Sequence, residues 1–98
     1  LYVDDLADAL VFLAEGYDSS EIVNIGTGVE ITIYGLAREI ADVVQFDGEI
    51  CLDRSKPDGA VRKLLNSEKL REMGWESQTL LKDGLQIMYS WAKERQLL

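Results

Sequence analysis

Three stretches with apolar residues at helical spacing constrain this chain most, because each must lie as a helix with one face on a core. In each stretch the apolar residues recur at helical spacing, which is i, i+3, i+4 and i+7 in the first, and charged residues fall off the stripe. The stripes are Leu6, Ala9, Leu10 and Leu13; Leu36, Ala37, Ile40, Val43 and Val44; and Leu81, Leu85, Met88 and Trp91. The spacing predicts three main helices whose stripes form the core. A short fourth helix is predicted at residues 67–73, before Gly74.

Short β-prone runs alternate with these helices. Residues 1–3, 22–25 and 49–52 are rich in apolar and β-branched side chains, and turn residues bound them. We expect each run to be a short strand. The predicted fold class is therefore α/β, a small mixed domain in which short strands alternate with helices. The chain length suits one domain, which we place at residues 1–98.

Side chains that cap helices stand before each predicted helix. They are Asp4 or Asp5, Thr32, Asn66 or Ser67, and Thr79. Asp4 and Asp5 have an alternative role as a metal-binding pair, but adjacent carboxylates at a helix entrance favour a cap. Trp75 follows the glycine that ends the short helix. We expect it to pack as a lid over the local core rather than to stack on a nucleotide base.

The run Gly26-Thr27-Gly28 follows the second predicted strand. A Gly-x-Gly after a strand is one part of a dinucleotide-binding fingerprint, yet the third glycine and the acidic residue that complete it are missing. We therefore interpret this run as a turn whose backbone visits positive φ.

Charge and residue types exclude several classes of function. The 18 acidic residues outnumber the 10 basic ones, for a net charge of −8, which argues against nucleic acid or an anionic membrane as a partner. No leader-like or bilayer-spanning apolar segment occurs, so the expected location is the cytoplasm. With no histidine and one cysteine, we expect no metal site. Cys51 is predicted to be a packed small hydrophobe in a reducing compartment, with a reactive thiol as the alternative.

Residues 55–65 hold the densest cluster of special residues. The only proline, Pro57, stiffens the backbone, and Asp58 begins an Asp-Gly turn. The basic residues of this loop are Lys56, Arg62 and Lys63. An aspartate that accepts hydrogen bonds from hydroxyls, beside bases that contact phosphate, would hold a diphosphate and a ribose. A surface loop whose bases balance nearby acids explains the same residues, and the residues alone favour this second interpretation.

Four runs in this order carry a family resemblance. They are Leu-Tyr-Val-Asp-Asp-Leu-Ala from Leu1, Val-Asn-Ile-Gly-Thr-Gly from Val23, residues 55–65, and Leu-Arg-Glu-Met-Gly-Trp from Leu70. Together they resemble the C-terminal portion of extended short-chain dehydrogenases/reductases that act on nucleotide sugars. The run at residues 55–65 most resembles that of the GDP-L-fucose synthase family. Those NADP-dependent epimerase/reductases convert GDP-4-keto-6-deoxy-mannose to GDP-L-fucose.

The resemblance implies that residues 1–98 are the substrate-binding part of a longer enzyme, as expected for a chain that does not open on methionine. NADP and the catalytic serine, tyrosine and lysine would then belong to a Rossmann domain that is absent here. It follows that this chain has no catalytic or cofactor-binding residue and is inactive alone. The resemblance assigns Asp58 to the GDP-sugar and Lys63 to its phosphate region, in a homodimeric parent. Ala60-Val61 replaces the Thr-Pro common in the family, which loosens the loop.

Two other functions stay open. One is part of another GDP- or UDP-sugar epimerase, dehydratase or reductase. The other is a free-standing acidic interaction module without catalysis, in which the apolar face of residues 85–91 binds a protein.

Overall fold

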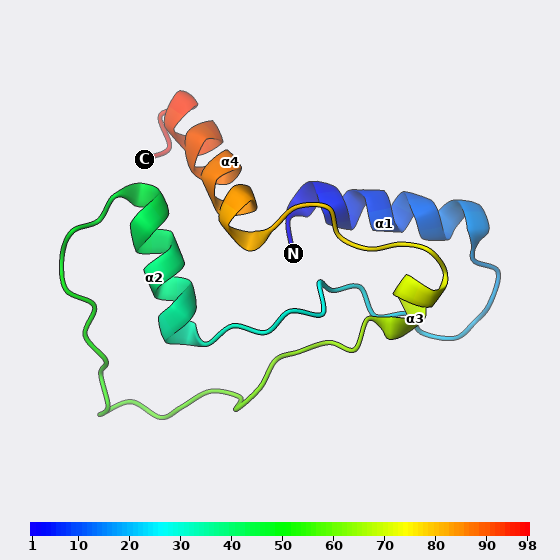
Figure 1. Cartoon of the computed structure of the whole chain (residues 1–98), viewed down its shortest axis with the longest axis horizontal. Coiled ribbons are helices and arrows are strands. Elements are labelled where there is room, and N and C mark those ends of the chain that lie inside the picture. Colours follow the sequence, from blue (N-terminus) through cyan, green and yellow to red (C-terminus); the bar gives the residue numbers. More distant parts are fainter.

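Helices joined by long connections make up the computed structural model, which describes residues 1–98 (Figure 1). The helices are α1 Val3–Gly16, α2 Ile33–Val44, α3 Glu68–Glu72 and α4 Leu81–Glu94. The three main helices and the short one lie where the sequence predicts them. The molecule is flat, with extents of 49 × 36 × 18 Å and a Cα radius of gyration of 16.6 Å. A compact chain of this length has a radius of gyration of about 13 Å, so the structure is open.

The helix starts confirm some capping predictions and correct another. Thr32 Oγ1 accepts a hydrogen bond from the Gly35 N–H at 2.9 Å, so Thr32 caps α2 as predicted. The N-cap of α3 is Ser67, which makes no side-chain cap hydrogen bond, whereas Asn66 Oδ1 just before it accepts one from the Glu68 N–H at 3.0 Å. The prediction that Thr79 caps α4 is wrong. The N-cap of α4 is Leu80, which makes no side-chain hydrogen bond.

Asp5 lies in the first turn of α1 but caps a different segment. Its carboxylate is buried, and Oδ2 accepts hydrogen bonds from the backbone N–H groups of Gln78 at 3.1 Å and Thr79 at 2.9 Å. The prediction that Asp4 or Asp5 caps α1 is therefore wrong, since Tyr2 is the N-cap there and makes no side-chain hydrogen bond. Asp5 instead attaches the segment before α4 to α1.

The predicted α/β fold class is wrong for this chain, because the structure contains no β-strand. Residue 3 of the first predicted strand already lies in α1. The other two runs lie in residues 18–31 and 47–66, whose backbone N–H and C=O groups make no backbone–backbone hydrogen bond. A strand needs a neighbouring strand to complete its ladder, and these segments have none within the chain. Their strand-like side-chain pattern still acts locally, since Val23 and Ile25 face the core while Ile22 is 88% exposed.

A small core joins α1, α3 and the segment before α2. Ala9, Leu70 and Trp75 are buried together. The partly buried residues around them are Phe12, Leu13, Val23 and Ile25. Trp75 covers this cluster as predicted, and its indole Nε1–H donates to Asp8 Oδ2 at 2.8 Å. A polar partner for the buried indole nitrogen removes the cost of burying it.

Several residues predicted to be core are exposed. In the α4 stripe, Leu81, Met88 and Trp91 are 41%, 58% and 48% exposed, so the prediction that this stripe is core is wrong in the isolated chain. The helix contacts α2 and rests Gly84 on the Tyr2 ring, but little else covers its apolar side. Cys51 is also exposed, which contradicts its predicted packing. None of the helices has the length and apolar character needed to cross a membrane.

Candidate functional site

The loop that carries Asp58 and Lys63 runs along one edge of the molecule between α2 and α3 (Figure 1). Both side chains are exposed, as are all the others at residues 51–66. No hydrogen bond or ion pair joins Asp58 to Lys63, and no ion pair engages Lys63. The structure thus presents both predicted site residues to solvent without bringing them together.

Arg62 is engaged by an acid. Its Nε lies 2.5 Å from Glu30 Oε1, and its Nη2 donates to Glu30 Oε2 at 2.8 Å, which makes a bidentate pair. The hydrogen bond and the negative charge of Glu30 raise the pKa of Arg62 above its ordinary value. For Arg62, the interpretation that a loop base balances a nearby acid is therefore correct, whereas Lys63 next to it remains unpaired.

Two contacts hold the loop against the segment that precedes α2. One is the Arg62–Glu30 pair. The other is packing at Gly26, where an added Cβ would lie 3.4 Å from Leu65 Cβ. The two segments consequently run in opposite directions side by side (Figure 1). Lys63 lies between these anchors, while Asp58 lies on the part of the loop beyond them.

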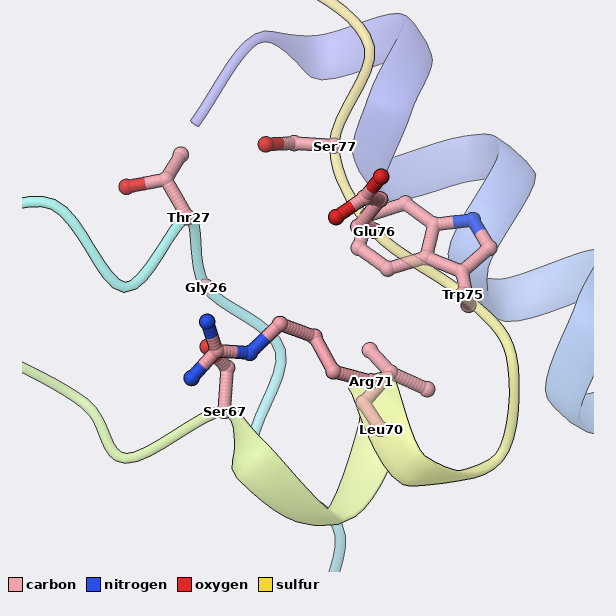
Figure 2. A pocket seen from close by; sticks show the side chains of 8 residues that line it. All are labelled: Gly26, Thr27, Ser67, Leu70, Arg71, Trp75, Glu76 and Ser77. Carbon is pink, nitrogen blue, oxygen red and sulfur yellow. The ribbon is translucent and has the colours of Figure 1, made fainter.

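A cavity of about 70 Å³ opens where this pair of segments meets α3 (Figure 2). Its lining comprises Gly26, Thr27, Ser67, Leu70, Arg71, Trp75, Glu76 and Ser77. The predicted turn with positive φ is confirmed beside it, since Gly28 has φ 75°. Sequence reasoning missed Arg71 and the cavity role of Ser67, because nothing in the local sequence indicates that they meet the glycine turn.

A second polar cluster supports α3 from the other side. Lys69 Nζ lies 2.9 Å from Glu21 Oε2 and donates to the Tyr17 hydroxyl at 3.0 Å. The hydrogen bond to Glu21 raises the pKa of Lys69, and the same bond lowers the pKa of Glu21. Glu21 is exposed, Tyr17 and Lys69 are half-buried, and each group already has its partner within the chain, so this cluster has the geometry of a structural tie rather than a reactive centre.

No family model matches the chain. It is 50% identical over 94 residues to a probable GDP-L-fucose synthase 1 from Oryza sativa subsp. japonica, a match that covers 96% of this chain and 29% of the relative. A GDP-6-OMe-4-keto-L-xylo-heptose reductase from C. jejuni superposes with a TM-score of 0.84 at 31% identity, over 94% of this chain and 29% of the reductase. A GDP-mannoheptose C4 reductase from Campylobacter jejuni with NADP bound gives a TM-score of 0.79 at 32% identity, over 92% and 29% of the two chains.

These matches cover nearly the whole chain but less than a third of each relative. The sequence identity of 50% and the TM-scores of 0.84 and 0.79 both relate this chain to enzymes that act on GDP-sugars. The chain is a homologue of a region of the GDP-L-fucose synthases, and it spans about 29% of their length.

Proposed function

We propose that residues 1–98 are the C-terminal nucleotide-sugar-binding part of a GDP-L-fucose synthase-like enzyme, which converts GDP-4-keto-6-deoxy-mannose to GDP-L-fucose with NADP. The observation that carries this proposal is 50% identity to a GDP-L-fucose synthase across 96% of the chain. The many exposed apolar side chains are also expected of a part that packs against the rest of an enzyme. The cytoplasm as location, a homodimeric parent and inactivity of the isolated chain belong to the same proposal.

The loop at residues 55–65 supplies the binding groups. No acid of this chain engages Lys63, so its ammonium is available for a phosphate oxygen of the GDP-sugar. Asp58 accepts hydrogen bonds from hydroxyl groups of the sugar or ribose. The pair of Glu30 and Arg62 fixes the loop next to Lys63, which reduces the number of conformations open to the Lys63 backbone. This division of roles explains why only one member of the Arg-Lys pair is free.

The residues of this chain do not fit NADP. A dinucleotide site places a helix N-terminus directly after its glycine turn, so that backbone N–H groups meet the pyrophosphate. Here Gly28 is followed by an extended segment, and α2 begins only at Ile33. The proposal therefore assigns NADP and the catalytic groups to the part of the enzyme that lies outside these residues.

Binding of nucleotide sugars to the full-length protein tests the proposal. Lys63→Ala is expected to weaken GDP-sugar binding about 10- to 100-fold, since a hydrogen bond to a charged group contributes about 1.5–3 kcal/mol. Lys82→Ala removes an exposed lysine on α4 and is the matched control, with unchanged affinity expected. Equal affinity of the Lys63 variant and the parent protein would refute the site, and a preference for UDP-sugars over GDP-sugars would refute the substrate.

A further inference from the structure

Ser67 has a buried hydroxyl group without a hydrogen-bond partner. The residue is 3% exposed, and its Oγ makes no hydrogen bond within the chain. Buried hydroxyls are nearly always paired, and Ser67 Oγ lines a cavity that has room for a partner from outside this chain. Ser67 Oγ is the only buried side-chain polar atom of the structure that has no hydrogen-bond partner.

Arg71 brings a positive charge to the same place. In Figure 2 its guanidinium ends beside Gly26 and the Ser67 hydroxyl. A Cβ built on Gly28 would lie 3.2 Å from Ser67 Oγ and 4.0 Å from Arg71 Cζ, which places both groups against the same glycine. The two ion pairs of the structure do not include Arg71, and it makes no side-chain hydrogen bond.

The glycine turn adds further donors. The backbone N–H groups of Gly26, Thr27 and Gly28 make no hydrogen bond within the chain, and the first two residues line the cavity. With φ at 75°, Gly28 keeps the turn in a conformation that exposes backbone and leaves space that a side chain would fill. Ser67 and Arg71 thus bring a hydroxyl and a guanidinium to one cavity beside the unpaired amides of the glycine turn, and these donors suit an oxyanion.

Glu76 decides which oxyanion fits. It lines the cavity opposite Ser67, on the segment that follows α3 (Figure 2), and lies farther from Arg71 than an ion pair requires. A carboxylate repels a bare anion but accepts a hydrogen bond from an anion that carries a proton. Phosphate near neutral pH keeps a proton for Glu76 while its other oxygens accept from Arg71 and Ser67. Sulfate has no such proton.

The cavity is too small to hold a nucleotide sugar. A volume of about 70 Å³ admits a single small ion, whereas pockets for drug-sized ligands measure about 300–1,000 Å³. We propose that this cavity binds one phosphate group, held by Arg71, Ser67 and the glycine turn, with Glu76 accepting its proton. This site is independent of the proposed GDP-sugar site, because it uses neither Asp58 nor Lys63.

Phosphate titrations of the full-length protein test this inference, with the melting temperature measured at constant ionic strength and chloride as the reference anion. Phosphate is expected to raise the melting temperature, and sulfate to raise it much less. Arg71→Gln and Ser67→Ala are each expected to raise the phosphate Kd at least about tenfold, because each removes one of the donors. Ser67→Ala should fold at least as well as the parent protein without phosphate, since it removes only an unpaired hydroxyl.

Lys82→Ala is the control and should keep the full response to phosphate. GDP provides the other arm: its effect should be lost in Lys63→Ala and kept in Arg71→Gln. A phosphate response that survives both cavity variants would overturn the inference, as would a response to sulfate equal to that to phosphate. The response to GDP tests the proposed function, and the response to phosphate tests the cavity. Failure of one therefore leaves the result for the other unchanged.

Discussion

Replacing Asp5 tests the contact that joins the two ends of the structure. Its carboxylate accepts hydrogen bonds from the Gln78 and Thr79 N–H groups at 3.1 and 2.9 Å, and the Thr79 hydroxyl lies 3.5 Å away. A hydrogen bond to a charged group contributes about 1.5–3 kcal/mol, and loss of the acceptor leaves two N–H groups unpaired. The long third contact adds little. Asp5→Ala is therefore expected to lower the free energy of unfolding by about 3–5 kcal/mol.

Asp5→Asn keeps the shape of the side chain and one oxygen acceptor, so it should cost about half as much. Asp4→Ala removes an exposed carboxylate from the same helical turn, where only a helix-dipole contribution of about 0.3–1 kcal/mol is lost. Urea unfolding followed by tryptophan fluorescence measures all three, because Trp75 is buried in the core cluster. If Asp5→Ala costs no more than Asp4→Ala, the carboxylate does not hold the segment before α4, and the reasoning fails.

Three further outcomes are expected. Trp75→Phe removes the indole hydrogen bond to Asp8 and part of the core, and should lower the free energy of unfolding by about 2–4 kcal/mol in the same urea assay. Gly28→Ala puts a Cβ on a residue with φ 75° and should cost about 1–2 kcal/mol, whereas no loss would mean that the turn relaxes freely. The Lys69–Glu21 pair should stabilise the fold only between a lower and an upper pH limit. Because the pKa of Glu21 is lowered, its contribution is present above the ordinary glutamate pKa and lost as pH falls through the lowered value. Because the pKa of Lys69 is raised, its contribution is present below the ordinary lysine pKa and lost as pH rises through the raised value. Melting temperatures of the parent protein and Glu21→Gln should differ between these limits and converge outside them.

The sequence predicted elements whose hydrogen bonds are local. The helix over Ile33–Val44 follows from its apolar stripe and from Thr32, which needs only the N–H of a residue three positions later. The turn at Gly28 likewise follows from the freedom of glycine at positive φ. The relationship to GDP-L-fucose synthases was also accessible, because runs such as the one at residues 55–65 are contiguous in the chain.

Contacts between distant residues were not accessible. Thr79 precedes α4 as an ordinary cap would, yet its own N–H is bound by Asp5, a residue 74 positions away. Residues 22–25 have the composition of a strand, but a strand exists only when another segment completes its ladder. The apolar stripe of α4 has the correct period for a core helix, although the period does not say what covers it.

The sequence by itself determined the positions of the helices, the glycine turn and the family of relatives, because each depends on residues that are neighbours in the chain. Only the tertiary structure decided that Glu30 engages Arg62 and leaves Lys63 free. Only the tertiary structure brought Arg71 and Ser67 to the glycine turn. The physical reason is that hydrogen bonding within a turn or helix is set by the local backbone. A charge or a hydroxyl instead takes its role from whichever distant group the fold places beside it.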